Sequence, residues 1–383
     1  MSVAATPSSS PPPPLPSPPS ASSAHAAGPR SANPADNAQR HAAPASADEH
    51  KQRDFNSLVN FSRNWLRWGA RWGKHGLIVA VQHIRHPVRR TRFLRPRIGN
   101  LAQHSPRRMQ IPRWYSQTAA PANPPRISIV TPSFNQAHLI ERTIRSVFDQ
   151  NYSNLEYIVQ DGASRDGTSR VLARFADRLN HWESVPDNGQ TDAINRGFRH
   201  ATGEIMAYLN SDDLLLPGAL NAVARHFTEH PEIDAVYGHR VLIDEQDREI
   251  GRWILPEHDN AVLNWADYIP QETLFWRRSA WDRVGGRFDE SFHFAMDWDF
   301  LLRLRDAGVR FARLPRFLGA FRVHDKQKTT AAISDLGVKE MARLRERQVG
   351  YVPEAAEVHV NCSRYLLRHL ACHAMYRAGL TRY

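Results

Sequence analysis

The fold is decided by the stretch YLNSDD, residues Tyr208–Asp213, which places two adjacent carboxylates after an apolar run that begins at Glu204. The run has the length and composition of a buried strand, and Pro217 stops any continuation. Two neighbouring anions raise each other's pKa unless a cation lies beside them. One interpretation is a divalent-metal site at the carboxyl end of a sheet, where open α/β sheets bind their ligands. The alternative is a solvated turn, because Asn, Ser and Asp favour turns.

Apolar periodicity on the N-terminal side of this stretch predicts alternating strands and helices. The predicted strands are 127–131, 155–160, 181–185 and 204–209, and the predicted helices are 138–150, 168–179 and 191–200. Short links in such an alternation predict an α/β fold with a mostly parallel sheet flanked by helices. The strand ends at Thr131, Asp161 and Asn210 share one edge of a parallel sheet, so Asp161, Asp212 and Asp213 should converge there. No Gly-rich phosphate loop follows these strands, so a nucleotide would need a metal on its phosphates.

The C-terminal half continues with a mixture of both element types. We predict helices at 220–230, 260–268 and 296–307, strands at 235–244, 249–255, 272–276 and 316–323, and two helices within 331–383. The sequence assigns no chemistry to this last segment.

Four motifs, in this order, closely resemble those of the family 2 glycosyltransferases. They are TPSFN at Thr131–Asn135, VQDGASRDGT at Val159–Thr168, DNGQTDAINRG at Asp187–Gly197 and NSDD at Asn210–Asp213. The resemblance runs from about residue 126 to 324. It implies a GT-A (nucleotide-diphospho-sugar transferase) fold, a nucleotide-diphosphate sugar donor, Mg²⁺ or Mn²⁺, and transfer with inversion.

The resemblance also assigns roles to individual residues. The nucleotide-sugar contacts would be Thr131, Pro132, Ser133, Asn135, Asp161, Gly189, Gln190, Asp192 and Asp212. The metal ligands would come from Asp212 and Asp213, with His324 of the late FRVH motif completing the metal shell or touching the diphosphate. Which aspartate binds the metal stays open, because Asn210 stands where many relatives carry another acid. A structural role is the alternative for His324.

An inverting enzyme needs a base that takes the proton of the acceptor hydroxyl. The run Met296–Phe300 (MDWDF) resembles the family's second acidic motif and aligns Asp297 with that base, although many relatives have Glu where Met296 stands. The alternative for Asp297 is a carboxylate stabilised by the helix N-terminus, and Asp299 is expected to cap or brace the helix. The acceptor pocket would include Gln271, Glu272 and Trp276. The processive Gln-x-x-Arg-Trp motif is absent, so transfer of one or a few sugars is expected.

The segments before the predicted catalytic domain differ sharply in composition. Residues 1–50 are rich in Pro, Ala and Ser, which predicts disorder. Residues 51–117 carry 15 Lys/Arg against one acid, so they account for the net charge of +11 of the whole chain. Helical periodicity within 54–76 places Phe61 and three tryptophans opposite a row of arginines. This pattern favours an anchor on an anionic membrane surface, with a helix packed on the main domain or nucleic-acid binding as alternatives.

These patterns give four segments: 1–50, disordered; 51–118, a basic segment and possible membrane-surface anchor; 125–330, the glycosyltransferase domain; and 331–383, a helical extension. Cys362 and Cys372 lack metal-ligand spacing, which weakly favours a reducing compartment. With no signal-peptide pattern and no apolar run of about 20 residues, we expect a cytoplasmic protein, peripheral at the inner face of the plasma membrane.

The functional prediction is an inverting glycosyltransferase that moves a sugar from a UDP, GDP or dTDP donor to a glycan or lipid-linked acceptor in cell-surface polysaccharide synthesis. The alternative is a non-catalytic nucleotide-sugar or carbohydrate-binding module that has kept the fold. Nucleic acid is not expected as a partner. A nucleotidyltransferase would need a Gly-rich, basic loop after the first strand, and the chain has none there.

Overall fold

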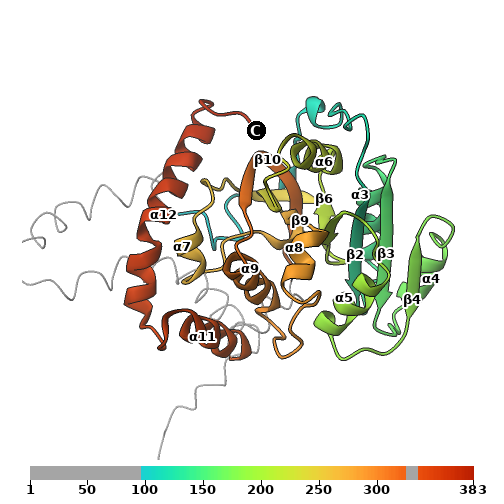
Figure 1. Ribbon diagram of the computed structural model, residues 1–383. Helices are drawn as coiled ribbons and strands as arrows, with labels where there is room; N and C mark the ends of the chain where they lie inside the picture. The colour runs from blue at the N-terminus through green and yellow to red at the C-terminus, as the bar shows by residue number, and fades with distance from the viewer. Residues whose placement is uncertain (1–95, 325–334) are drawn as a thin grey trace, which may run out of the picture. The chain divides into compact units, whose positions relative to one another are not determined.

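A computed structural model describes residues 96–324 and 335–383, and four parallel strands form the first half of its sheet (Figure 1). β2 (Ile127–Ser133) lies between β3 (Leu155–Asp161) and β5 (Ile205–Tyr208), and β4 (His181–Ser184) pairs with β3 at the sheet edge. These strands match the predicted ones to within a few residues. The predicted α/β fold class is therefore confirmed.

Three helices connect these strands and cover both faces of the sheet. They are α3 (Ile140–Phe148), α4 (Thr168–Ala173) and α5 (Gln190–Arg199). Alternate residues of β2 point to opposite faces: Ile129 packs with the apolar side of α3, and Val130 packs with Ile194 of α5. All residues of β2 are buried, the polar ones included, because both faces of the strand are covered. The predicted helix 168–179 is shorter in the structure and ends at Ala173.

The second half of the sheet is mixed, because antiparallel strands join the parallel ones there. β9 (Phe275–Arg277) lies antiparallel between β5 and β7 (Ala235–Ile243), and β8 (Arg248–Trp253) forms a hairpin with β7. β10 (Phe311–Arg322) runs parallel to β7. Two short strands complete the sheet: β6 (Leu214–Leu215), which pairs with β10, and β1 (Arg107–Arg108), which pairs with β8.

The second half of the sheet is accompanied by four helices and a 3-10 turn, some of which differ from the predicted elements. α6 (Ala219–Glu229) and α9 (Met296–Asp306) appear as expected, and α8 (Arg278–Arg283) was not predicted. α7 (Asn260–Leu263) is much shorter than the predicted 260–268. The predicted strand 272–276 begins only at Phe275, because Gln271–Thr273 form a 3-10 turn after Pro270. Asp267 and Tyr268, which follow the shortened helix, and Glu272 of the turn line the candidate site described below.

The two C-terminal helices pack on the catalytic body. α11 (Leu336–Val349) and α12 (Ala355–Arg377) confirm the predicted helical segment, and α12 lies beside α7 (Figure 1). Leu344 and Tyr365 belong to the same apolar cluster as residues of α9. The buried carboxylate of Asp299 joins α9 to α11, because it forms ion pairs with Arg303 of α9 at 2.8 Å and with Arg347 of α11 at 2.6 Å. Its predicted bracing role is therefore confirmed. Among the described residues, no helix has the length and apolar character needed to cross a membrane.

The described part of the basic N-terminal segment also packs on the body. Residues 1–95, which include the predicted disordered segment and the amphipathic stretch 54–76, lie outside the described residues. From residue 96 onward, Arg107 forms an ion pair with the buried Glu249 at 2.6 Å. A 3-10 turn at Arg113–Tyr115 buries Tyr115 completely, and its hydroxyl accepts a hydrogen bond from the backbone N–H of Phe317 at 3.1 Å. Residues 96–118 are therefore part of the folded catalytic body.

This packing predicts a sharp difference between two truncations. A chain that begins at residue 96 keeps every described contact, whereas one that begins at residue 119 loses β1 and the buried ring of Tyr115. Burial of a large aromatic ring stabilises a fold by about 3 kcal/mol. We expect the shorter chain to unfold at a lower urea concentration. Its free energy of unfolding should be lower than that of the longer chain by at least this amount. Equal urea midpoints for the two chains would contradict the packing role of residues 96–118.

Candidate functional site

One cavity of about 790 Å³ opens at the carboxyl ends of the parallel strands. Its walls come from the ends of β2 and β5, the start of α5, the loop 267–272 and the loop before α9. The predicted site residues in its lining are Pro132, Ser133, Gly189, Gln190, Asp212, Gln271, Glu272 and Asp297. The structure thus brings together residues that are up to 165 positions apart in the sequence.

Several other predicted nucleotide-sugar residues lie behind the cavity wall and hold its loops. The buried Thr131 hydroxyl lies 3.0 Å from the hydroxyl of Tyr157. Asn135 has a left-handed backbone, with φ of 52°, which Asn tolerates better than most residues. Its side-chain oxygen accepts a hydrogen bond from the N–H of Arg165 at 2.9 Å. Asn135 therefore connects the TPSFN loop with the loop after β3.

Two predicted aspartates are also held by their own neighbours. Asp161 is buried, and its carboxylate accepts hydrogen bonds from the hydroxyls of Ser164 and Ser184, each at 2.5 Å. Asp192 pairs with Arg196 at 2.7 Å and accepts a hydrogen bond from the N–H of Asn188 at 2.9 Å. Asp161 thus ties β3 to β4, and Asp192 fixes the turn that leads into α5. Neither residue is part of the cavity lining.

The paired aspartates after β5 have different surroundings. Asp212 lines the cavity, and its Oδ2 lies 3.0 Å from Nε2 of His324. Asp213 is buried, and its Oδ1 accepts a hydrogen bond from the N–H of Arg322 at 3.0 Å. Burial, followed by the charge of Asp212, raises the pKa of Asp213 well above its ordinary value. A carboxylate and an imidazole are suitable ligands for a divalent ion, so Asp212 and His324 fit the metal that the sequence predicts.

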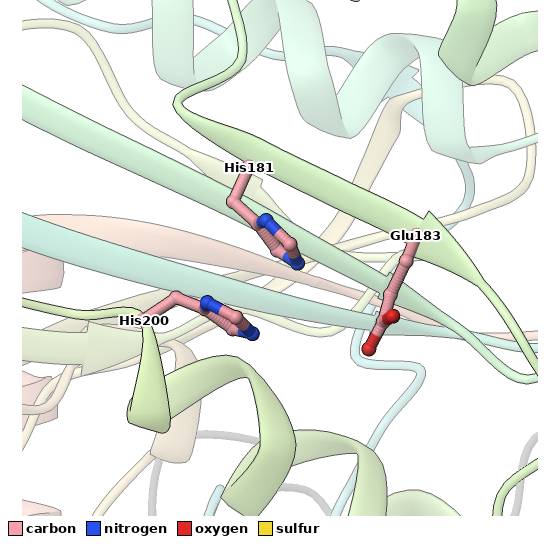
Figure 2. A group of neighbouring side chains, drawn as sticks. All are labelled: His181, Glu183 and His200. Carbon is pink, nitrogen blue, oxygen red and sulfur yellow. The ribbon is translucent and has the colours of Figure 1, made fainter. Parts of the chain in front are cut away.

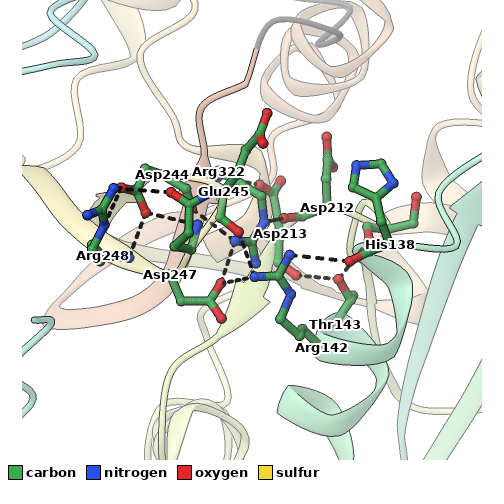
Figure 3. Close-up of polar contacts among 12 residues, drawn as sticks. His138, Arg142, Thr143, Asp212, Asp213, Asp244, Glu245, Asp247, Arg248 and Arg322 are labelled. Atoms are coloured by element: carbon green, nitrogen blue, oxygen red, sulfur yellow. Dashed lines mark hydrogen bonds and ion pairs between the residues drawn. The ribbon is translucent and has the colours of Figure 1, made fainter. Parts of the chain in front are cut away.

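A buried arginine connects these aspartates to the turn between β7 and β8 (Figure 3). Nε of Arg322 donates to the backbone oxygen of Asp212 at 2.7 Å, and its Nη1 donates to the backbone oxygen of Asp244 at 3.0 Å and to the carboxylate of Asp247. Arg142 of α3 approaches the same Asp247 carboxylate at 3.2 Å. The position of the Asp212 backbone is thus fixed by a fully buried cation that sequence analysis did not single out.

Asn210, which replaces an acid of many relatives, forms the centre of a chain of amide hydrogen bonds. Its Oδ1 accepts from Nε2 of Gln190 at 2.7 Å, and its Nδ2 donates to Oε1 of Gln271 at 3.1 Å. Nε2 of Gln271 donates in turn to the backbone oxygen of Tyr208 at 2.7 Å. An aspartate at position 210 has no N–H to donate. The amide is therefore required for a chain that links the predicted donor and acceptor sides.

The predicted base lies beside a second carboxylate in the cavity wall. Asp297 is at the start of α9, and its Oδ1 accepts a hydrogen bond from the N–H of Trp298 at 2.9 Å. Asp267 lines the same cavity, to which its side chain is open. Desolvation by the surrounding walls, followed by the negative charge of Asp297, raises the pKa of Asp267 well above its ordinary value. A carboxyl group with a raised pKa beside a second carboxylate is typical of acid–base sites.

The opposite wall carries a cation that sequence analysis also missed. Nε of Arg240 donates to Oε1 of Glu272 at 2.7 Å, and the guanidinium lies 4.4 Å from the ring centroid of Phe321 and 4.8 Å from that of Trp253. Arg240 lies on β7, in a strand that is otherwise mostly apolar. That isolated charge in a buried strand was the available signal, because a buried arginine needs a nearby anion.

Trp276 does not belong to the acceptor wall predicted for it. Its side chain is completely buried and packs with Phe198, Trp281 and Phe300. The ring centroids of Trp276 and Phe300 are 4.9 Å apart. Trp276 lies on β9, three residues after the turn Gln271–Thr273, and strand alternation directs it into the core. We therefore assign Trp276 a packing role.

The C-terminal helices contribute to the site in a way that the sequence did not reveal. The Glu340 carboxylate of α11 accepts hydrogen bonds from the N–H groups of His293, Phe294 and Ala295, at 2.8 to 2.9 Å. This loop lines the cavity and leads directly into Asp297. Glu340 therefore holds the segment that positions the predicted base.

The raised pKa of Asp267 predicts a pH-dependent effect of Asp267→Asn on stability. A carboxyl whose pKa is higher in the folded than in the unfolded protein stabilises the fold at low pH, and this stabilisation is lost as pH rises. The neutral amide avoids that loss. We expect the melting temperature of the variant, relative to the original protein, to increase between about pH 4 and pH 8. Asp282→Asn, at an exposed site on α8, is the control, and the same pH trend there would contradict the explanation.

Comparison with known proteins links the chain to sugar-transfer enzymes. The family model described as "Glycosyl transferase family 2" matches residues 128–296. An uncharacterized glycosyltransferase of Mycobacterium tuberculosis (strain CDC 1551) is 30% identical over 185 residues, which cover 47% of this chain and 68% of the relative. A PGL/p-HBAD biosynthesis glycosyltransferase of Mycobacterium bovis BCG is 30% identical over 183 residues, covering 47% and 69%.

Other similarities are more distant. The O-antigen biosynthesis protein RfbC of Myxococcus xanthus is 28% identical over 244 residues, which cover 61% of this chain and 19% of that protein. Among solved structures, TarS 1–349 of S. aureus in complex with UDP-GlcNAc is 19% identical, covers 64% of this chain and 73% of that chain, and has a TM-score of 0.49. A mannosyltransferase from Pyrobaculum calidifontis in complex with GDP-Man and Mn²⁺ is 18% identical, covers 87% and 88%, and has a TM-score of 0.47.

Proposed function

The chain belongs to glycosyltransferase family 2, and on that premise we propose that it transfers a sugar, with inversion, from a nucleotide-diphosphate donor to a hydroxyl group. The protein is a glycosyltransferase with the GT-A fold that the four motifs predict. The observation that carries the proposal is the single cavity in which Asp297, Asp212 and the TPSFN and DNGQ motif residues meet. A non-catalytic binding module needs no such base in the cavity wall.

The proposed reaction uses Asp297 as the general base. Its carboxylate takes the proton of the acceptor hydroxyl while that oxygen attacks the anomeric carbon, and the bond from this carbon to the diphosphate oxygen breaks on the opposite side. The Trp298 N–H at Oδ1 and the N-terminal end of α9 stabilise the carboxylate in its ionised form. Gln190 and Gln271, joined through Asn210, position the two substrates on either side of that carbon.

The proposed metal ligands are Asp212 and His324, which lie 3.0 Å apart. A bound Mg²⁺ or Mn²⁺ would neutralise negative charge on the diphosphate leaving group. Asp213 and Arg322 would keep the Asp212 backbone in place. This assignment selects Asp212 over Asp213 as the ligand, because Asp212 lines the cavity whereas Asp213 is buried behind it.

We propose a cell-surface glycan or lipid-linked precursor as the acceptor. The names of two relatives, for O-antigen and PGL/p-HBAD biosynthesis, support this class. A UDP, GDP or dTDP sugar is proposed as the donor. Anchoring at the inner face of a membrane through residues 54–76, a disordered segment 1–50 and a cytoplasmic location remain proposals based on sequence patterns.

The proposal is tested by calorimetric titration with UDP-, GDP- and dTDP-sugars in the presence of Mn²⁺ and then of EDTA. We expect one nucleotide class to bind, with an affinity that falls when the metal is removed. Incubation of that donor with glycolipid extracts should then release the nucleoside diphosphate. Binding without turnover in any extract would favour the non-catalytic module, and binding of no donor would contradict the proposed site.

A further inference from the structure

Two histidines and a glutamate converge at the sheet edge formed by β4 (Figure 2). His181 and Glu183 are two residues apart on β4, so their side chains lie on the same face of the strand. His200 follows the last residue of α5 and approaches from the helix side. One ligand atom from each of the three residues lies within 4.8 Å of the others.

One buried ring nitrogen of this cluster lacks the partner that buried polar atoms normally have. Nε2 of His181 is buried and has no hydrogen-bond partner within the described part of the chain. The rings of His181 and His200 are stacked, with centroids 3.7 Å apart and an interplanar angle of 16°. A buried polar atom without a partner needs an explanation, and a bound cation is one. A pair of imidazoles beside a carboxylate matches a ligand set used for zinc.

We propose that His181, Glu183 and His200 bind a borderline divalent cation, with Zn²⁺ as the preferred ion and water in the fourth position. Nitrogen ligands favour Zn²⁺ over the oxygen-seeking Mg²⁺ or Mn²⁺ proposed for Asp212. A shared ion lies near the plane of each ring that binds it, so the stacked rings must turn relative to each other on binding. The exposed His200 at the end of α5 has the space to make this turn.

The position of the cluster suggests what the ion does. β4 ends at Ser184, whose hydroxyl donates to the predicted donor contact Asp161. α5 begins at Gln190, which lines the catalytic cavity. An ion held between the start of β4 and the end of α5 therefore braces two elements that carry donor-side residues. It acts on the stability of these elements and takes no part in sugar transfer.

The test is calorimetric titration of the full chain with Zn²⁺ alone, after EDTA treatment and dialysis. Asp212→Asn serves as the background in every titration, so that the proposed catalytic metal site does not compete. We expect a Zn²⁺ binding event that raises the melting temperature. His200→Ala and Glu183→Gln should each weaken this event by at least about tenfold. Co²⁺ in place of Zn²⁺ should give the visible absorption bands of a four-coordinate nitrogen and oxygen site, and the two variants should lose them.

His230→Ala is the matched control. His230 lies near another histidine, His226, at a centroid distance of 4.5 Å, and 3.4 Å from the carboxylate of Glu232. It should bind Zn²⁺ like the background protein. Melting temperatures measured in EDTA show whether each variant is folded, and the conservative Glu183→Gln change gives a second reading if His200→Ala is unstable. The proposal is overturned if the background protein binds no Zn²⁺, or if His200→Ala and Glu183→Gln retain its affinity.

Discussion

Asp297→Asn is expected to lower kcat/KM by about 10²- to 10⁴-fold while leaving the Kd of the donor nearly unchanged. The amide has almost the shape of the carboxylate, and its oxygen still accepts the hydrogen bond from the Trp298 N–H. It has no basicity with which to take the proton of the acceptor hydroxyl. A loss that falls on transfer alone is what separates a base from a residue that binds the donor. The measurement combines steady-state transfer rates with donor calorimetry on the same preparation.

The control for this substitution is Asp306→Asn at the other end of the same helix. Asp306 is exposed and pairs with its neighbour Arg305, so its replacement removes a charge from α9 without changing the cavity. It should transfer sugar at close to the original rate. Loss of donor binding together with transfer in Asp297→Asn would refute the assignment of Asp297 as the base.

The fold was predictable where one local pattern determines each element. Strands β2, β3 and β5 each contain a short apolar run that is buried, and turn residues bound each run, so the local pattern identifies them. β9 and the turn Gln271–Thr273 were not separable in this way, because a short apolar run after a proline is compatible with either conformation. The antiparallel position of β9 between β5 and β7 depends on long-range pairing that no local pattern records.

The site was predictable as a set of motifs but not as a network. The strand-end argument correctly brings Asn210 and Asp212 to the cavity, whereas Asp161 and Asp213 are buried behind its wall. Asp267 and Arg240 were missed because Asp267 lies in a segment predicted as an ordinary helix and Arg240 in an ordinary core strand. Their significance comes from opposite charges and shared walls, and these arise only when distant segments pack.

The same limitation explains the overlooked role of the C-terminal helices. Glu340 is one of two acidic residues on α11, and its sequence position gives no sign that three backbone N–H groups before Asp297 point at it. Trp276 shows the converse error, because its position in the motif order suggested a substrate contact. A strand alternates its side chains between faces, so a shift of one residue in the predicted strand changes which side chain reaches the cavity.

The two aspartates after β5 should respond differently to the same substitution, which decides the metal ligand that sequence left open. Asp212→Asn is expected to weaken metal-dependent donor binding by at least about tenfold, because it replaces an ionised ligand in the cavity wall by a neutral amide. Asp213→Asn should change that binding little. Burial and the neighbouring Asp212 raise the pKa of Asp213, so a neutral side chain suits its surroundings, and the amide oxygen can still accept from the Arg322 N–H.

Stability provides an independent reading of the same pair. The raised pKa means that the folded protein holds the Asp213 proton more tightly than the unfolded chain, so the metal-free original protein loses stability as pH rises. In EDTA, Asp213→Asn should therefore melt at an equal or higher temperature than the original protein at about pH 8. Titrations of the donor with and without Mn²⁺, together with these melts, test both assignments. Loss of Mn²⁺-dependent binding in Asp213→Asn, with binding retained in Asp212→Asn, would reverse them, because the buried carboxylate would then be the one that holds the ion.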